Sequence, residues 1–268
     1  MLWDAKDGSV LFDCVRMDYV RFGRGEKHLV ILPGLSDGLA SVKGKALLLA
    51  PPYRMFFEKY SVWMFSRRDP LRPGRTIRGM AEDQAAAMRA LGIDRAAVMG
   101  VSQGGMIAQL FAADQPEMTE ALILAVTAPC VNDGIRACVE NWIAMAGRGD
   151  HKSLMIDTAE KSYSEARLKT YRKLYPILGA VGRPKSDERF LANAQAILGF
   201  DARAELGKIA CPTLVLGGEE DRIVGAEASR ELHEQIAGSE LYIYPGLGHA
   251  VYEEAEDFNG RVYRFLEG

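Results

Sequence analysis

Eight short apolar runs along the chain have the length and composition of β-strands. The runs in the second half are almost continuously apolar, which is typical of strands buried on both faces of a parallel sheet. The pattern therefore predicts a mostly parallel, eight-stranded sheet. Its strands are expected at residues 15–22, 28–33, 45–50, 60–66, 96–101, 121–127, 212–217 and 240–245.

Amphipathic helices are predicted between these strands. In residues 76–91 the apolar positions recur at helical spacing, and Gly92 provides a stop. Further helices are expected at 104–114, 225–236 and 253–266. Strands that alternate with helices in this way predict a doubly wound α/β fold with helices on both faces of the sheet.

The alternation stops between residues 130 and 208, where no clear strand is found. This segment is expected to form helices around 133–146, 151–173 and 186–198, separated by GRGD at 147–150 and GAVGRP at 179–184. A helical block between two strands of an α/β sheet is a candidate lid. We therefore predict an α/β core formed by residues 1–129 and 209–268 and a helical lid at 130–208 inserted into it.

Composition narrows the class of protein. The chain has 268 residues, of which 48% are hydrophobic, and a formal net charge of −3. This balance predicts no general attraction to nucleic acid or to an anionic membrane. No apolar run approaches the roughly 18 residues of a membrane span, and we expect no secretory signal at the N-terminus. The four cysteines are widely spaced, which predicts reduced thiols, a cytoplasmic location and no zinc site.

One serine stands in a setting that favours nucleophilic catalysis. A catalytic serine needs exposure, a base and an oxyanion site. The sequence Gly100-Val101-Ser102-Gln103-Gly104 has the G-x-S-x-G pattern, in which a sharp turn from strand to helix exposes the serine. The two glycines leave room for that turn. Because an expected strand precedes the motif and an expected helix follows it, we predict Ser102 as the nucleophile. The alternative is a simple Gly/Ser turn.

Four histidines are candidates for the base. His28 opens a strand, His151 lies in the predicted lid, and His233 lies on a helix at an expected surface position. His249 follows the last strand directly. The carboxyl ends of parallel strands open onto one edge of the sheet, where ligands bind. Because Ser102 and His249 should share that edge, we predict His249 as the base, with a structural role as the alternative.

The acid that orients the base is expected after another strand of the same edge. Glu219, Glu220 and Asp221 directly follow the run at 212–217. Each of them could instead be a solvated loop charge. Asp221 is favoured, because the chain returns to apolar residues immediately after it. The order serine, aspartate, histidine is the order of hydrolases with a G-x-S-x-G turn.

Two backbone N–H groups are expected to form an oxyanion site. One belongs to Gln103, the residue after the nucleophile, at the start of a helix. The other is assigned to Leu35, in the loop after the strand at 28–33. Gly34 allows the backbone to approach closely there. The alternative is a plain Pro-Gly turn that leaves the strand.

Together these segments resemble the α/β-hydrolase superfamily, in its lid-bearing, single-domain branch of serine hydrolases. The resemblance rests on ILPGLSDG at 31–38, GVSQGG at 100–105, PTLVLGGEED at 212–221 and GLGHAVYEE at 246–254. It implies a nucleophile, acid and base at Ser102, Asp221 and His249, and oxyanion donors at Leu35 and Gln103. It also implies a helical lid after the strand at 121–127.

The chain departs from the pattern of this superfamily at three positions. Pro33-Gly34 stands where the superfamily commonly has His-Gly, so any hydrogen bond from that histidine is lost. A serine at position 102, rather than an aspartate, separates the chain from the haloalkane dehalogenase and soluble epoxide hydrolase branches. Gln103 stands where cofactor-free haloperoxidases often have Trp.

These residues predict an enzyme, a serine hydrolase that cleaves a small to medium carboxylic ester or similar acyl substrate through an acyl-enzyme. No metal or organic cofactor is expected, and the expected partner is a small-molecule substrate. A lactonase, a C–C bond hydrolase or a lyase with the same triad remains open, as does a ligand-binding receptor, because fold does not fix chemistry. The lid side chains considered for packing or substrate contact are Trp142, Met145, Met155, Tyr163, Tyr171, Tyr175 and Phe190.

Overall fold

The computed structural model describes residues 2–176 and 186–268, and eight strands in them form one sheet. The strand order is β1-β2-β4-β3-β5-β6-β7-β8. The pairs β1–β2 and β2–β4 are antiparallel, and the remaining pairs are parallel, which confirms the mostly parallel sheet. The strands are β1 (Lys6–Phe12), β2 (Val15–Phe22), β3 (Lys27–Leu32), β4 (Tyr60–Phe65), β5 (Ala96–Val101), β6 (Thr119–Ala125), β7 (Thr213–Gly218) and β8 (Glu240–Tyr244).

The strand predicted at 45–50 is wrong. Residues Ala46–Leu49 form a single helical turn, α1, which leads into the 3₁₀ helix Pro51–Phe56. Leu47 and Leu48 in α1 are largely exposed. A short apolar run does not by itself distinguish strand from helix, and leucine is a good helix former. The prolines that follow α1 lack the N–H groups that a sheet ladder requires.

The strand that the apolar pattern missed is β1. It is an edge strand, most of its side chains are exposed or half-buried, and it contains Gly8. Such a sequence carries little of the alternation that marks a strand. Its hairpin with β2 turns at Asp13 and Cys14, which both have positive φ, in place of the Asn-Gly or Asp-Gly pair that usually signals such a turn.

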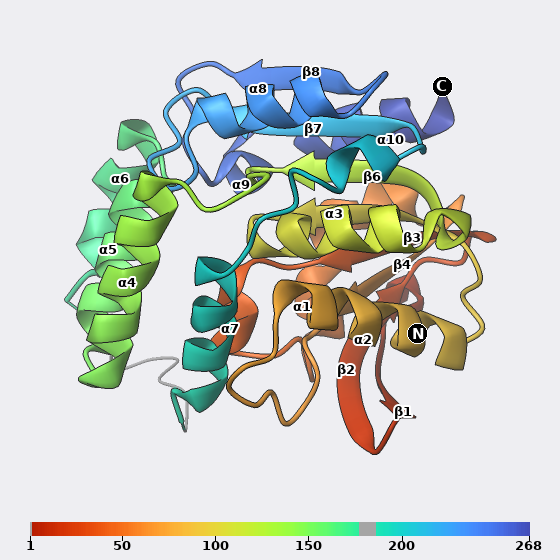
Figure 1. The fold of residues 1–268 in the computed structure, drawn as a ribbon, viewed down its shortest axis with the longest axis horizontal. Helices are drawn as coiled ribbons and strands as arrows, with labels where there is room; N and C mark the ends of the chain where they lie inside the picture. The colour runs from red at the N-terminus through yellow and green to blue at the C-terminus, as the bar shows by residue number, and fades with distance from the viewer. Residues whose placement is uncertain (1, 177–185) are drawn as a thin grey trace.

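Helices cover both faces of the sheet (Figure 1). Val30 and Leu32 of β3 belong to one buried cluster, whereas Leu29 and Ile31 belong to the other. Both sides of the central strands are therefore apolar, which explains the continuous apolar runs. On one side pack α2 (Ile77–Ala90), α3 (Gln103–Asp114) and α8 (Ala226–Gln235), and on the other α1, α9 (Val251–Glu254) and α10 (Phe258–Glu267). The helix predicted at 253–266 is thus broken into α9 and α10.

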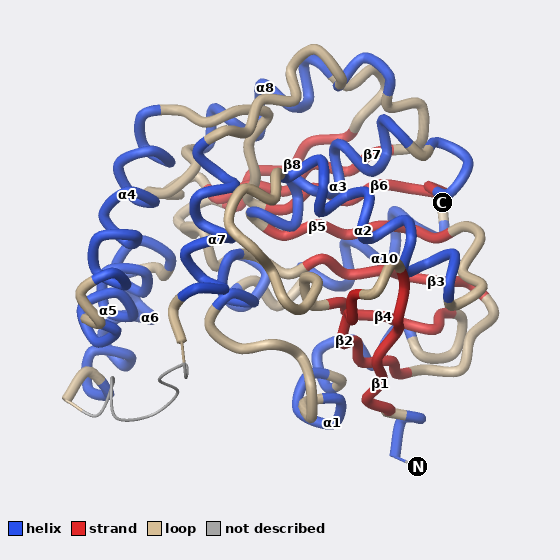
Figure 2. The backbone as a smooth tube through the Cα atoms, turned by 60° about the horizontal axis from the view of Figure 1, so that its bottom comes forward, coloured by secondary structure: helices blue, strands red, loops and turns tan. Residues whose placement is uncertain are grey.

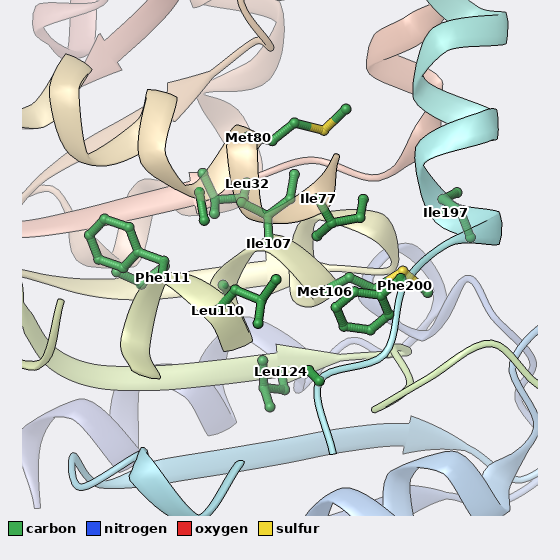
Figure 3. Close-up of a cluster of buried hydrophobic side chains, with 14 of the residues drawn as sticks. Leu32, Ile77, Met80, Met106, Ile107, Leu110, Phe111, Leu124, Ile197 and Phe200 are labelled. Atoms are coloured by element: carbon green, nitrogen blue, oxygen red, sulfur yellow. The ribbon is translucent and has the colours of Figure 1, made fainter. Parts of the chain in front are cut away.

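Helix α3 is held firmly by its surroundings. Every residue from position 103 to 113 is buried. Figure 3 shows α3 side chains among those of α2 and of the neighbouring strands. The labelled members of this cluster include Leu32, Ile77, Met80, Met106, Ile107, Leu110, Phe111 and Leu124. The N-terminus of α3, where Ser102 lies, is therefore fixed by the core.

In the described part of the chain between β6 and β7, four α-helices lie at one end of the sheet in both views (Figures 1 and 2). They are α4 (Asp133–Gly147), α5 (His151–Ser162), α6 (Glu165–Tyr171) and α7 (Glu188–Leu198). The helix predicted at 151–173 is broken, because Tyr163 is extended and the Ser164 side chain caps α6. The predicted separator at 179–184 lies outside the described residues. A lid function for these helices, and the domain boundaries, stay predictions.

Two observations concern a membrane span and a metal site. Within residues 2–176 and 186–268, no helix has both the length and the apolar character needed to cross a membrane. In the same part of the chain, no three His, Cys, Asp or Glu side chains gather in a way that could hold a metal ion.

Candidate active site

Ser102 occupies a strained turn between β5 and α3. Its φ and ψ are 53° and −119°, a combination that is costly for a residue with a Cβ atom. A Cβ on Gly104 would lie 1.9 Å from the Leu32 carbonyl oxygen, and one on Gly100 would lie 2.4 Å from the Gly104 carbonyl oxygen. Both glycines of the motif are therefore required by close backbone contacts, and the turn sets Ser102 at the carboxyl end of a central strand.

His249 and Asp221 form a buried pair. His249 Nδ1 lies 2.7 Å from Asp221 Oδ2, and both side chains are almost fully buried. The other carboxylate oxygen, Oδ1, accepts hydrogen bonds from the backbone N–H groups of Ile223 (2.8 Å) and Val224 (3.0 Å). Because an ionised carboxylate only accepts, Nδ1 carries the proton, and Nε2 is the ring nitrogen that can accept another.

The electrostatics of Asp221 favour its ionised form. Burial by itself raises the pKa of the carboxyl group. The charge and hydrogen bond of His249 and the two backbone hydrogen bonds act in the opposite direction. Their combined effect is larger, so the pKa of Asp221 lies below its ordinary value. The aspartate is thus a carboxylate that can hold the imidazole in one orientation.

The alternative acids lie elsewhere. Glu219 and Glu220 are both exposed, and Glu219 accepts a hydrogen bond from the Gly246 N–H group. Their position in the loop after β7 keeps them at the surface, while the next residue, Asp221, turns inward. Of the three acids that follow β7, Asp221 is the one that the structure brings to His249.

The other three histidines lie in different surroundings. His28 accepts a hydrogen bond from the Trp63 indole (3.2 Å), and His233 is exposed beside Ser239. His151 is buried and lies 3.4 Å from Asp187. None of the three lines the cavity that contains Ser102, whereas His249 does.

The turn after β3 lies against Ser102. Gly34 precedes the 3₁₀ turn Leu35–Gly38, and a Cβ on Gly34 would lie 3.4 Å from the Ser102 Cβ. Leu35 is the first residue of this turn, and Gln103 is the first residue of α3. Backbone N–H groups at the start of a helical turn have no intrahelical acceptor. Both predicted oxyanion donors therefore have an N–H group without an intrahelical bond next to the serine.

A small cavity contains these groups. It measures about 110 Å³, and its wall includes Ser102, His249, Gly34 and Leu35. The inserted helices contribute apolar side chains to the same wall. Of the seven side chains considered from the sequence, Trp142 and Phe190 line it. Three others pack against one another instead, because Tyr163 contacts Tyr171 and Tyr171 contacts Tyr175.

A buried polar network that the sequence analysis missed supports the turn. Arg67 lies just past the carboxyl end of β4 and is almost fully buried. It donates to the Pro33 carbonyl oxygen (2.5 Å) and to Gln103 Oε1 (3.2 Å). Gln103 Nε2 donates in turn to the Asn193 carbonyl oxygen on α7 (2.8 Å). Burial lowers the pKa of Arg67 to about 10, against the opposing charge of Asp37, so the guanidinium keeps its charge at neutral pH.

A second set of contacts joins the network to the inserted helices. Asp37 Oδ2 accepts from the Arg67 backbone N–H (2.9 Å) and from Arg189 Nη2 (2.7 Å). Arg189 belongs to α7 and also donates to the carbonyl oxygens of Arg67 and Arg68. The sequence feature that could have revealed this network is the charged pair at 67–68. It directly follows an apolar strand and lies at the ligand-binding edge of the sheet.

The break between α5 and α6 lies against the loop that carries His249. The Ala250 N–H donates to the Ser162 carbonyl oxygen (2.9 Å). Ser164 donates to Glu254 twice, from its hydroxyl (2.6 Å) and from its backbone N–H (3.0 Å). The Tyr163 hydroxyl donates to Glu253 (2.6 Å). The interruption of the predicted helix thus provides groups that hold the segment just after His249.

Comparison with known proteins agrees with this architecture. The sequence model of the family "Serine aminopeptidase, S33" matches residues 77–256. A putative carbamate hydrolase RutD of Caulobacter sp. (strain K31) is 28% identical, over 87% of this chain and 90% of the relative. A 2-hydroxy-6-oxo-6-phenylhexa-2,4-dienoate hydrolase of Burkholderia cepacia is 27% identical, over 78% of this chain and 73% of the relative.

Among solved structures, the enol-lactonase from Burkholderia xenovorans LB400 superposes with a TM-score of 0.84 at 20% identity, covering 97% of this chain and 100% of that chain. At this identity the likeness concerns the fold. The family match extends over more than half of the chain, from α2 to α9. The protein therefore belongs to the serine aminopeptidase S33 family of α/β-hydrolases and is a hydrolase.

Proposed function

We propose that the protein is a serine hydrolase that cleaves a small to medium carboxylic ester, or a similar acyl substrate, through Ser102, His249 and Asp221. The observation that carries the proposal is the buried His249–Asp221 pair, whose imidazole lines the same cavity as Ser102. A serine at an exposed turn, a base held by a carboxylate and backbone N–H groups beside the serine are the parts that acyl transfer requires.

The proposed reaction has two halves. His249 Nε2 takes the proton of the Ser102 hydroxyl while the oxygen attacks the substrate carbonyl carbon. Asp221 holds the imidazole and stabilises its charged form. The N–H groups of Leu35 and Gln103 stabilise the negative oxygen of the tetrahedral intermediate. His249 then gives its proton to the leaving alcohol, and water repeats the same steps on the acyl-enzyme to release the acid.

A second candidate is cleavage of a lactone, a carbamate or a C–C bond by the same residues. It is favoured by the names of the similar proteins, which include a putative carbamate hydrolase, a dienoate hydrolase and an enol-lactonase. In each case a serine could attack a carbonyl carbon, and the difference lies in the leaving group. The substrate panel below therefore includes these classes.

The test is a panel of p-nitrophenyl esters, a lactone, a carbamate and a dienoate, with Ser102→Ala beside the wild type. We expect turnover of at least one class and a loss of about 10³-fold or more in kcat in the variant. A fluorophosphonate should label the wild type and leave Ser102→Ala unlabelled. If the wild type turns over no substrate and takes no label, the proposal is wrong, and a ligand-binding role becomes the better account.

A matched pair of histidine variants tests the base. His249→Ala should lose activity about as severely as Ser102→Ala. When residues act as one catalytic unit, removing either of them lowers kcat by a similar factor. His233→Ala should keep wild-type activity, since His233 is exposed and lies outside the cavity. Equal inactivation of the two variants would contradict the assignment of His249.

Two coarser proposals accompany this one. We keep a lid role for residues 130–208, supported by Trp142 and Phe190 in the wall of the cavity. We also keep a cytoplasmic location, supported by four cysteines that are all free thiols.

A further inference from the structure

A second cavity adjoins the one that contains Ser102. It measures about 410 Å³, and Gly34, Ser36 and Tyr252 belong to the walls of both cavities. The two spaces therefore meet at the turn after β3 and at the first turn of α9. Val101, the residue before the nucleophile, also lines the larger cavity.

The two cavities differ in the size of the group that each can hold. Pockets that take a whole small-molecule ligand commonly measure about 300–1,000 Å³. The cavity of about 110 Å³ at Ser102 is well below that range. The cavity at Ser102 is large enough for the reacting carbonyl group and its nearest atoms. The rest of a larger substrate has to lie outside it, and the adjoining cavity of about 410 Å³ is in the size range of a ligand site.

The walls of the second cavity are mainly apolar. Ile31, Met64 and Met99 contribute from the carboxyl ends of three neighbouring strands, and Phe258 contributes from α10. Methionine adapts its shape to irregular apolar ligands. Polar side chains such as Arg167, Glu253 and Asn259 are part of the wall as well. A flexible hydrocarbon chain fits the strand-derived part of this wall better than a charged or sugar-like group does.

The two cavities lie on opposite sides of the sheet edge. Trp142 and Phe190, in the wall at Ser102, belong to the buried cluster that contains α2 and α3. Ile31, Met64 and Met99 belong to the cluster of the other face. A substrate with its carbonyl at Ser102 and its chain in the second cavity would thus cross the edge of the sheet beside Tyr252.

The surface near the second cavity is also apolar. Leu48, which lines the cavity, is 74% exposed, and Leu47 and Met55 in the same segment are 53% and 44% exposed. Large apolar side chains exposed together usually mark a site of contact with an apolar ligand or partner. Helix α1 and the 3₁₀ helix after it therefore offer an apolar approach to the cavity.

We propose that the cavity of about 410 Å³ binds the extended apolar chain of the substrate while the carbonyl group reacts at Ser102. The substrate class is then a medium-chain ester, and Tyr252, at the junction of the two cavities, lies beside the chain. This inference rests on the proposed serine hydrolase function.

The test compares two tryptophan substitutions of leucines. Leu49 lines the second cavity, whereas Leu11, which is 74% exposed on edge strand β1, lines neither cavity. In the wild type, kcat/KM for p-nitrophenyl esters should rise from acetate to octanoate, by up to about fourfold for each buried methylene. Leu49→Trp should raise KM for the octanoate ester about 10-fold or more, since it removes the space for several methylenes. It should raise KM for the acetate ester far less, because an acetyl group does not reach the second cavity, and Leu11→Trp should affect neither ester.

Two controls keep the result decisive. If Leu49→Trp fails to fold, Leu48→Trp tests the same cavity from a side chain that is 74% exposed. A second series, octyl acetate against ethyl acetate, shows whether the chain belongs to the acid or the alcohol, and a Trp-sensitive chain effect in either series supports the inference. If neither series shows such an effect while acetate esters are still hydrolysed and Ser102 is labelled, this inference is wrong and the hydrolase proposal stands. Without turnover and label, the hydrolase proposal itself fails.

Discussion

At the scale of single residues, the buried carboxylate of Asp221 links the candidate site to stability. Its pKa lies below the ordinary value of 3.8, because His249 and two backbone N–H groups outweigh the effect of burial. A carboxyl group with a lowered pKa in the folded state stabilises the fold above its unfolded pKa. That contribution is lost as the pH falls below 3.8 and through the lower folded value.

Asp221→Asn should therefore destabilise the protein mainly at neutral pH. The amide oxygen can still accept from the backbone, but the charge that stabilises a protonated imidazole is gone. We expect a loss of about 1–3 kcal/mol in the free energy of unfolding near neutral pH, the usual effect of removing a charged hydrogen-bond partner. The difference between variant and wild type should be retained down to about pH 3.8 and shrink as the pH falls below it. Urea unfolding followed at a series of pH values measures it.

The control for this pH dependence is Glu227→Gln. The side chain of Glu227 is 89% exposed, so its substitution should change stability little at any pH. A difference between Asp221→Asn and the wild type that stays constant as the pH falls well below 3.8 would contradict the account of the Asp221 pKa.

The residues predicted from the sequence share one property, which is that each stands next to a strand end. Ser102, Asp221 and His249 follow strands whose apolar runs are continuous, so topology alone brings them to one edge. The network of Arg67, Gln103 and Asn193 could not be predicted in this way. Its hydrogen bonds join residues 36 and 90 positions apart, and they depend on how α7 packs rather than on any local pattern.

At the scale of elements, apolar periodicity predicted the buried strands. It failed at edge strand β1 and at the surface helix α1. Strands β3 to β7 are covered on both faces, so their sequences carry a strong signal. Edge strand β1 is largely solvated, and its sequence carries almost none. The opposite error at residues 45–50 arose because α1 keeps leucines at the surface. If α1 borders a substrate chain, the exposed leucines that misled the prediction serve binding.

The break between α5 and α6 is the element that ties the inserted helices to the base. Ser164 acts twice: its hydroxyl oxygen accepts from the Arg167 N–H as a helix cap, and its hydroxyl and N–H both donate to Glu254. A continuous helix across 163–164 would have no extended residue to present these groups. The interruption therefore ends the helix and provides a contact with α9. Helix α9 begins two residues after His249.

Glu254→Gln should loosen this contact while it keeps the size of the side chain. The amide offers one acceptor oxygen where the carboxylate offers two, so one of the two donors of Ser164 loses its partner. We expect kcat/KM to fall by about fivefold or more, since a hydrogen bond to a charged group contributes about 1.5–3 kcal/mol and part of that acts on the position of His249. The amide proton of Ser164 should exchange with solvent faster than in the wild type.

Glu256→Gln is the matched control for the substitution at position 254. Glu256 is an exposed neighbour just after α9, and its substitution should leave both activity and exchange at Ser164 unchanged. Wild-type exchange at Ser164 in Glu254→Gln would show that the hydrogen bonds to α9 do not hold the break in place.

At the scale of the whole molecule, the inserted helices and the sheet behave as one packed body. Trp142, Phe190 and Ile197 from the insertion belong to the same buried cluster as the α2 and α3 side chains of the core. Polar contacts cross the same boundary, because Arg189 of α7 bonds to Asp37 in the turn after β3. An insertion with this much shared core should not unfold independently of the sheet.

Arg189→Met tests that cooperativity. Asp37 is almost fully buried, and removing its charged partner should cost on the order of 3 kcal/mol. For a protein of this length, that corresponds to a single melting transition lowered by about 6–12 °C. Arg230→Met, which breaks an exposed pair with Glu227, should lower it by no more than about 2–4 °C. Calorimetry distinguishes the outcomes: a main transition that stays in place while a second, smaller one appears at lower temperature would mean that the insertion melts as a separate unit.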